Sequence, residues 1–341
     1  PAGADKAITI NESGSHTFAV SEFGFTDPND TPPNNFVSIK ISSLTLESGD
    51  SLTVNQGGVV SVTNGMVITT AQIPSLLYTP AAGANGLPRS TFQFAVTDDG
   101  GKANSGEDTD QLPNTISLNV SDTTPPTVSV NIVDPSLNNS DKVSNVTFTF
   151  SENVAGFVAG DLTLAGGTIS DFMVISGSSY SVTFTANDGF EGTGSVTVPA
   201  SSYQDNAGNN GSAGSDTVTI DTRNPTVTVT IAEDVLNGVV TDTDVTIEFS
   251  EVVTGFDLAD VSALRSNMSA AGGSFSSLIT LVANRKFKTT YTAPASFNDT
   301  VTILVAGTGY TDIPLNPGVD GSDTVIVNTN LSQLDFDDEF V

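Results

Sequence analysis

The segments FTFSENVAGF (Phe148–Phe157) and IEFSEVVTGF (Ile247–Phe256) show how this chain is organised. They lie 99 residues apart, and the same offset relates TPPTVSVNI (Thr124–Ile132) to RNPTVTVTI (Arg223–Ile231). Two matches at one offset indicate that a whole domain is repeated. A repeat of about 100 residues exceeds the solenoid periods and indicates domains that fold one after another.

A third match defines the length of the later copy. The segment SDTVTIDT (Ser215–Thr222) recurs as SDTVIVNT (Ser322–Thr329) at an offset of 107 residues. The later copy therefore carries about eight additional residues, which we place between Asp260 and Asp312.

Apolar residues occupy every second position within each copy, as in strands with one buried face. Clusters of Gly, Asn, Asp and Pro separate these segments, and no segment has the periodicity of an amphipathic helix. About seven short strands in 100 residues are typical of an immunoglobulin-like sandwich. The alternating positions in the first copy are Val146, Phe148 and Phe150, then Val182 and Phe184, Val196 and Val198, and Val218 and Ile220.

The fold class predicted from these patterns is all-β, with three tandem antiparallel β-sandwich domains of Ig-like type arranged as an extended rod. A chain of 341 residues is too long for one core, because single cores rarely exceed about 250–300 residues. We expect an N-terminal domain at residues 1–121, repeat A at residues 122–221 and repeat B at residues 222–330. Residues 331–341 form an acidic and hydrophobic tail.

The N-terminal domain is of the same class but is not a third copy. Its expected strands lie near residues 16–20, 37–46, 51–54, 91–96 and 115–120. The junctions that follow it and repeat A are short and contain proline, which restricts the backbone.

The net charge of −29 limits the partners that the chain can bind. Nucleic acids and anionic membranes are poor partners because they are themselves negative. The carboxylates are scattered at turns, where oxygen ligands for a hard cation would lie. We therefore expect Ca²⁺ as the cofactor. The alternative is that the charge only keeps an extracellular protein soluble.

The chain contains no cysteine, which excludes disulfides and thiolate metal sites. No apolar run reaches the roughly 18 residues that a membrane helix needs, and the first residues do not resemble a signal peptide. We expect an internal segment of a longer, secreted bacterial protein that is monomeric in isolation.

Two sets of motifs carry a family resemblance. The segments DTTPPTVSVNI, FSENVAGF, DLTLAGGTIS and YQDNAGNNGSAGSDTVTIDT resemble bacterial Ig-like repeats of giant secreted adhesins, over residues 122–329. The segments FAVSEFGFTDPND, YTPAAGANG, FQFAVTDDGG and PNTISLNV, over residues 18–121, resemble the cadherin-like modules of repeats-in-toxin adhesins.

The resemblance implies an extracellular location on the bacterial cell surface and a role in cell adhesion or biofilm attachment. Such domains commonly extend a distal binding region away from the cell, and calcium is expected at their junctions. One departure is Asn328-Thr-Asn330, where the earlier copies have Asp122 and Asp221, which weakens the case for a calcium joint after repeat B.

Sandwich topology gives an independent reason for calcium at the joints. The chain enters a seven-strand sandwich at the end to which the second-to-third and sixth-to-seventh strand loops return. Carboxylates from the linker and both loops should converge there and repel one another unless a cation neutralises them. The predicted ligands are Asp122, Glu152, Asp205 and Asn206 for repeat A, and Asp221, Glu251 and Asp312 for repeat B.

Further ligands are predicted with alternative roles left open. Asp161 and Asp260 are candidates in the two repeats, although Asp161 alternatively begins a strand, and the segment from Asp205 alternatively forms only a turn. In the N-terminal domain, one loop carries Asp27, Asn29 and Asp30, and another carries Asp98, Asp99, Asp108 and Asp110.

An enzyme is not expected, because His16 is the only histidine, cysteine is absent and no glycine-rich loop opens onto a helix. The leading hypothesis is a calcium-rigidified extender segment that contacts its neighbouring domains. The alternatives are a module that binds a peptide, glycan or surface through Arg285–Lys288 of repeat B, and an S-layer-type lattice protein. Finally, the alternation of Leu334 and Phe336 in the tail suggests strand addition, with a passive linker as the alternative.

Overall fold

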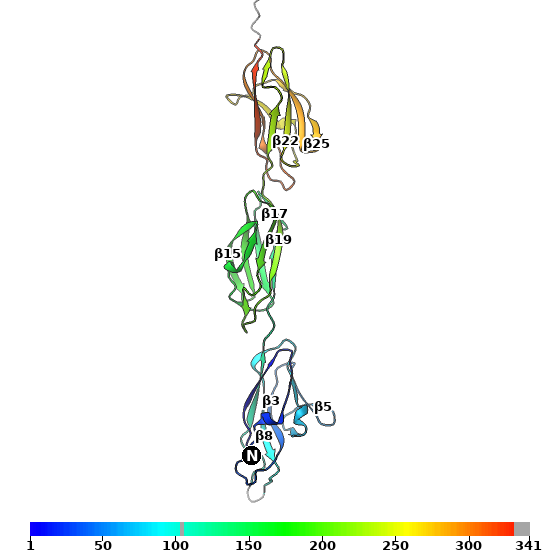
Figure 1. The fold of residues 1–341 in the computed structure, drawn as a ribbon, viewed down its shortest axis with the longest axis vertical. Coiled ribbons are helices and arrows are strands. Elements are labelled where there is room, and N and C mark those ends of the chain that lie inside the picture. Colours follow the sequence, from blue (N-terminus) through cyan, green and yellow to red (C-terminus); the bar gives the residue numbers. More distant parts are fainter. Residues whose placement is uncertain (103–105, 331–341) are drawn as a thin grey trace, which may run out of the picture. The chain divides into compact units, whose positions relative to one another are not determined.

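The structure is a computed structural model that describes residues 1–102 and 106–330. Those residues form β-strands and short 3-10 turns, and they include no α-helix, so the all-β prediction is confirmed (Figure 1). The same residues contain no helix long and apolar enough to cross a membrane. The predicted strand addition by the tail lies outside the described residues.

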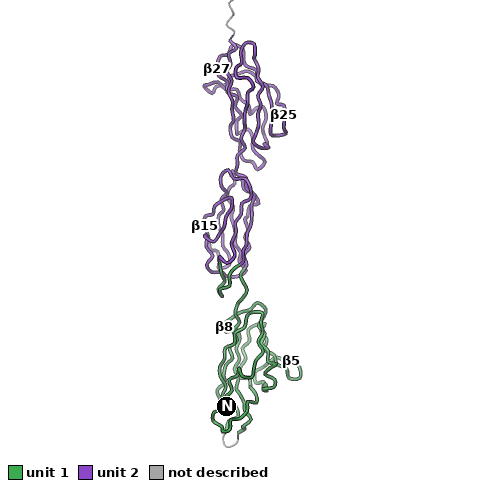
Figure 2. The backbone as a smooth tube through the Cα atoms, viewed as in Figure 1, with its two compact units in different colours: residues 1–126, 203–211 green, residues 127–202, 212–341 purple. Residues whose placement is uncertain are grey.

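The chain divides into two compact units (Figure 2). The first unit comprises residues 1–126 and 203–211, and the second comprises residues 127–202 and 212–341. The second unit therefore holds most of repeat A together with repeat B. Within the first unit the Tyr203 hydroxyl donates to the Pro126 carbonyl oxygen at 3.1 Å. The three domain boundaries expected from the sequence remain predictions.

Two sheets form the N-terminal part of the first unit. The order of the larger is β1-β9-β8-β3-β6, and that of the smaller is β2-β7-β4-β5. The larger sheet contains β1 (Lys6–Asn11), β3 (Phe36–Thr45), β6 (Val67–Thr69), β8 (Gly86–Asp98) and β9 (Asn114–Ser121). The smaller contains β2 (His16–Thr17), β4 (Ser51–Asn55), β5 (Val59–Ser61) and β7 (Leu77–Thr79), with 3-10 turns η1 (Val20–Phe23) and η2 (Ile73–Ser75) nearby.

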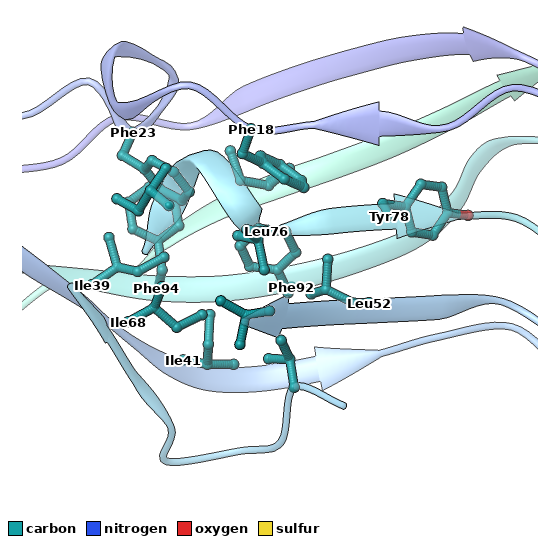
Figure 3. Packing of buried hydrophobic residues seen from close by; sticks show 14 of the residues in the cluster. Phe18, Phe23, Ile39, Ile41, Leu52, Ile68, Leu76, Tyr78, Phe92 and Phe94 are labelled. Atoms are coloured by element: carbon teal, nitrogen blue, oxygen red, sulfur yellow. The ribbon is translucent and has the colours of Figure 1, made fainter. Parts of the chain in front are cut away.

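The core of the first unit lies between these two sheets (Figure 3). Phe92 and Phe94 of β8 point into it, and Phe18 and Phe23 pack on them edge to face at centroid distances of 5.6 and 4.9 Å. Such ring pairs add roughly 0.5–1.5 kcal/mol beyond the area they bury. Tyr78 is also buried, and its hydroxyl donates to Asp50 at 2.6 Å.

Repeats A and B each form two facing sheets with the same strand plan. In repeat A the orders are β10-β12-β16-β15 and β11-β19-β17-β14, and in repeat B they are β20-β22-β26-β24, with β25 also on β26, and β21-β28-β27-β23. Repeat A contains β10 (Val128–Ile132), β11 (Ser136–Asn138), β12 (Val143–Phe150), β13 (Val154–Ala155), η4 (Ala159–Asp161), β14 (Thr163–Ala165), β15 (Gly167–Ser176), β16 (Ser179–Ala186), β17 (Glu191–Val198), β18 (Gln204–Asp205) and β19 (Gly214–Asp221). Repeat B contains β20 (Val227–Ile231), β21 (Val235–Asn237), β22 (Asp242–Phe249), η5 (Leu258–Asp260), β23 (Val261–Arg265), β24 (Ser274–Phe275), β25 (Ile279–Val282), β26 (Lys286–Thr292), β27 (Asn298–Val305), η6 (Gly307–Gly309) and β28 (Gly321–Asn328).

Each sandwich closes in the same way, because a strand from its beginning runs parallel to its last strand. These pairs are β1 with β9, β11 with β19, and β21 with β28. In repeat A the register places Asn138 opposite Asp221, and in repeat B it places Asn237 opposite Asn328. The last strand therefore delivers residue 221 to the end of repeat A, where repeat B begins.

The alternation read from the sequence matches the observed burial. Each of the nine alternating residues of repeat A, from Val146 to Ile220, is buried. The equivalent strand of repeat B buries Val245, Ile247 and Phe249. Alternation therefore located the core faces correctly.

Candidate metal centres

Three carboxylates meet where repeat B follows repeat A, inside the second unit. Asp221 ends β19, Glu251 follows β22, and Asp312 lies in the loop between η6 and β28. One oxygen from each lies within 4.8 Å of the others. The structure thus brings together the predicted ligands of repeat B from three distant places in the sequence.

The Asp312 carboxylate is fixed by one neighbour, Asn316. The Asn316 backbone N–H donates to Asp312 Oδ1 at 2.7 Å, and its side-chain Nδ2 donates to Asp312 Oδ2 at 2.8 Å. Both residues are 0% exposed. An Asp whose side chain accepts from nearby backbone groups is a common turn device, and here it also sets the direction of the carboxylate.

Asn316 also connects this cluster to repeat A. Its Oδ1 accepts from the Asn139 backbone N–H at 2.6 Å, and its Nδ2 donates to the Asp221 carbonyl oxygen at 2.9 Å. Two further bonds join the same surfaces, from Asn138 Nδ2 to the Pro314 carbonyl oxygen and from Asn139 Nδ2 to Asn224 Oδ1. One buried amide therefore contacts the carboxylates and the preceding repeat at once.

The electrostatics show that this cluster is unfavourable without a counter-ion. Burial raises the pKa of Glu251, and the negative charges of Asp312, Asp221 and Glu191 raise it further. Burial also raises the pKa of Asp221; the Arg223 N–H opposes this rise, whereas Asp312 and Glu191 add to it. Raised carboxyl pKa values mean that the folded chain disfavours the charged forms that a cation would bind.

Glu191 is a fourth acid beside the cluster, and it belongs to repeat A. It opens β17 directly opposite Asp221 in the register of β17 with β19. Its carboxylate lies 3.6 Å from Arg223 Nη1, and both side chains are well exposed. Like charges directly opposite each other destabilise a sheet, so this pair needs compensation.

The repeat A ligands divide between the two units. Asp122 and Asp205 lie in the first unit with carboxylate oxygens within 4.8 Å, whereas Glu152 lies in the second unit. Asn209 donates to Asp205 through its backbone N–H and its side chain, both at 2.8 Å, as Asn316 does to Asp312. Burial raises the pKa of Asp205, but these donors outweigh it and the net pKa is lowered. Asn206 is exposed.

In the first unit the structure groups Asp27, Asp30 and Asp98, with oxygens within 4.8 Å of one another. The other predicted ligands of this domain lie outside the group. Asn29 is exposed, and Asp99 accepts two hydrogen bonds from Asn35. Asp108 lies 3.5 Å from Lys102 Nζ, and Asp110 accepts from the backbone N–H groups of Gly3 and Leu112 and from the Asn114 side chain.

Asp161 and Asp260 occupy equivalent places, and neither belongs to a grouped cluster among the described residues. Each ends a 3-10 turn and accepts from a backbone N–H three residues earlier, that of Val158 at 2.7 Å or that of Asp257 at 2.8 Å. Both therefore have a local structural role, and ligation by them stays a prediction.

Sequence reasoning missed Asn209, Asn316 and Glu191. A signal for the first two was present, since Tyr-x-Asp-x-x-x-Asn occurs at Tyr203–Asn209 and at Tyr310–Asn316 with the offset of 107 residues. No linear pattern identified Glu191, because its relation to Asp221 depends on the strand register.

The cations of Arg285–Lys288 are engaged inside repeat B. Lys286 lies 2.8 Å from Glu248, and Lys288 lies 2.6 Å from Asp244. Arg285 donates to the carbonyl oxygens of Phe249 and Ser250. These contacts indicate that the segment is a solvated strand face rather than an anion-binding surface.

Comparison with known proteins gives a family match over most of the chain. Residues 122–220 and 221–329 each match the model of the bacterial Ig-like domain. No curated protein sequence matches the chain.

Solved structures show distant similarity. Mouse cadherin-23 EC22-24 is 14% identical, with 96% of each chain covered and a TM-score of 0.40. The Yersinia pseudotuberculosis adhesin InvE is 17% identical over 61% of this chain and 60% of its own, with a TM-score of 0.24. Invasin, a bacterial integrin-binding protein, is 11% identical over 88% of this chain and 55% of its own, with a TM-score of 0.32. The chain thus covers less than two thirds of each adhesin chain.

Proposed function

The chain belongs to the family of bacterial Ig-like domains through residues 122–220 and 221–329, and from this premise we propose that it is a calcium-stiffened extender segment of a bacterial cell-surface adhesin. In this role the tandem domains act in adhesion or biofilm attachment by holding a distal binding region away from the cell. The proposal places the chain outside the cell as a monomer without enzymatic activity.

The observation that carries the proposal is the Asp221, Glu251 and Asp312 cluster at the junction of the two repeats. Its donors are all carboxylate oxygens, which suit a hard cation, and Ca²⁺ accepts about six to eight oxygens at about 2.3–2.6 Å. Asp221 lies at the end of repeat A, whereas Glu251 and Asp312 belong to repeat B. A cation held by all three would join the two repeats.

Calcium would convert a repulsive joint into a cohesive one. Without it, the carboxylates repel one another, and hydrogen bonds of Asn316, Asn138 and Asn139 hold the two repeats together. At a calcium concentration ten times the dissociation constant, binding adds about 1.4 kcal/mol per site. The larger effect is on interdomain motion, because ligands on both sides of the linker restrict its dihedral angles.

The same arrangement is proposed for the junction before repeat A. Asp122 and Glu152 precede Asp221 and Glu251 by the 99-residue offset, and Asp205 precedes Asp312 by the 107-residue offset. Their equivalence in sequence supports a second calcium joint with these three ligands.

Small-angle X-ray scattering of the full chain, with calcium and after chelation, tests the proposal. We expect a larger maximum dimension and less interdomain disorder with calcium. Glu251→Gln should reduce this response, whereas Glu248→Gln should preserve it, because Glu248 is an exposed strand residue paired with Lys286. Identical scattering in both conditions would rule out stiffening by calcium.

Two alternatives have weaker support. A peptide- or glycan-binding role for repeat B would use Arg285, Lys286 and Lys288, but these cations already have partners within the repeat. Binding of isolated repeat B to a peptide or glycan array would favour that role. An S-layer-type lattice would appear as self-assembly when calcium is added.

A further inference from the structure

We propose that Asp27, Asp30 and Asp98 form a separate calcium site at the end of the N-terminal domain remote from Asp122. Strands β8 and β9 are antiparallel, with Gly86 opposite Val120 and Phe94 opposite Asn114. Asp98 at the end of β8 and Asp122 just after β9 therefore lie at opposite ends of one sheet. The site is independent of the joints in the proposed function, and either can fail without the other.

The two inner carboxylates are buried and each leaves one oxygen without a hydrogen bond. The side chains of Asp27 and Asp98 are 1% exposed. Asp27 Oδ2 accepts from the Asn34 backbone N–H at 2.7 Å, and Asp98 Oδ1 accepts from that of Gly100 at 2.9 Å. The opposite oxygens, Asp27 Oδ1 and Asp98 Oδ2, are buried without a hydrogen-bond partner.

An orphaned buried carboxylate oxygen is costly, because nothing replaces the water it has lost. Two such oxygens in one group imply a ligand that satisfies both. The backbone N–H donors hold the outer oxygens and so orient the inner oxygens. This is the arrangement in which local hydrogen bonds orient the ligands of a metal.

The charge of the group shows which kind of ligand it attracts. Asp27, Asp30 and Asp98 bring three carboxylates together. A divalent cation would neutralise two of their negative charges.

The remaining ligands can come from Asp30 and from water. Asp30 is exposed, and its Oδ2 accepts from Asn34 Nδ2 at 2.7 Å, which leaves Oδ1 available. A polar cavity of about 330 Å³ lies beside the site, lined by Asp30, Asn34, Asp98 and Glu107 among others. Two fixed oxygens, an exposed carboxylate and a polar cavity suit Ca²⁺, which tolerates irregular coordination, better than Mg²⁺, which requires near-ideal octahedra.

Calcium binding to the full chain tests this inference. Equilibrium dialysis should show that the double variant Asp27→Asn with Asp98→Asn binds one ion fewer than the unmodified chain. The control is Asp99→Asn, which removes a neighbouring carboxylate already bonded to Asn35 and should bind the full number. The double variant should also melt no lower than the unmodified chain in chelator, because its buried charges are gone.

A folding check keeps this test decisive. Circular dichroism of the double variant in chelator shows whether it is folded. Equal numbers of bound ions in the folded double variant and in the unmodified chain would overturn the site.

Discussion

Asn316→Ala should separate calcium binding at the joint from the mechanical link between repeats A and B. The substitution keeps the backbone bond to Asp312 Oδ1 but removes four side-chain bonds, to Asp312 Oδ2, to the carbonyl oxygen and Oδ1 of Asp221, and to the Asn139 N–H. Because Asp312 is fully buried, its released oxygen cannot find water without opening the loop.

The magnitude follows from the kinds of bonds removed. A hydrogen bond to a charged group is worth about 1.5–3 kcal/mol, and a neutral one about 1 kcal/mol. In chelator we expect a loss of about 4 kcal/mol, or roughly 15 °C in melting temperature for a domain of about 110 residues. With calcium the loss should fall to about 2 kcal/mol, because the cation stabilises the freed carboxylate but does not replace the bonds to the Asp221 carbonyl oxygen and the Asn139 N–H.

Thermal unfolding by circular dichroism, with calcium and with chelator, measures both losses. The control is Asn210→Ala, which removes an exposed amide that accepts from the Gln204 side chain. Titration calorimetry should show that Asn316→Ala still binds calcium, and scattering should show that it stiffens less. A loss in chelator no larger than that of the control would refute the role of Asn316 at the joint.

Three further outcomes are expected. Glu251→Gln should reduce the calcium-dependent gain in melting temperature relative to Glu248→Gln, and titration calorimetry with equal affinities would remove Glu251 from the ligands. The pKa of Glu251 in the folded, calcium-free chain is raised above its unfolded value of about 4.5. This shift stabilises the folded state below the unfolded pKa, and the stabilisation is lost as the pH rises through the folded pKa. Glu251→Gln should thus be more stable than the unmodified chain at pH 7 but not at pH 4, as urea unfolding would show. Arg223→Thr, which copies the equivalent Thr124, should raise calcium affinity at this joint several-fold by removing a competing cation, and a calorimetric affinity that stays constant would contradict this.

The fold was largely predictable, because strand alternation is a local property of the sequence. The longer strands of the N-terminal domain were expected within a few residues, as in β4 (Ser51–Asn55) and β9 (Asn114–Ser121). The short strands β5, β6 and β7 were not foreseen. Each has only three residues, too few for alternation to stand out. Strands β6 and β7 form through pairing with strands distant in sequence, whereas β5 forms a hairpin with β4.

The metal centres were predictable only where topology fixes the meeting point. Asp221, Glu251 and Asp312 could be placed together because the linker and two loops share one end of a sandwich. In the N-terminal domain, adjacent aspartates differ in the direction in which their side chains point. Asp98 faces inward and Asp99 bonds outward to Asn35, and only the strand register decides which of two adjacent side chains is buried.

The two repeats also differ where their last strand pair ends, and this difference indicates why repeat A carries acidic residues there. In repeat A, Glu191 lies opposite Asp221, and 107 residues later repeat B places Asn298 opposite Asn328. The last strands, β19 and β28, begin with the same five residues, so solubility and strand pairing would favour similar residues at both ends. Like charges opposite each other cost stability, and only the copy whose end meets the Asp312 loop bears that cost. The acids of repeat A are therefore better explained by the joint with repeat B than by the sandwich that carries them.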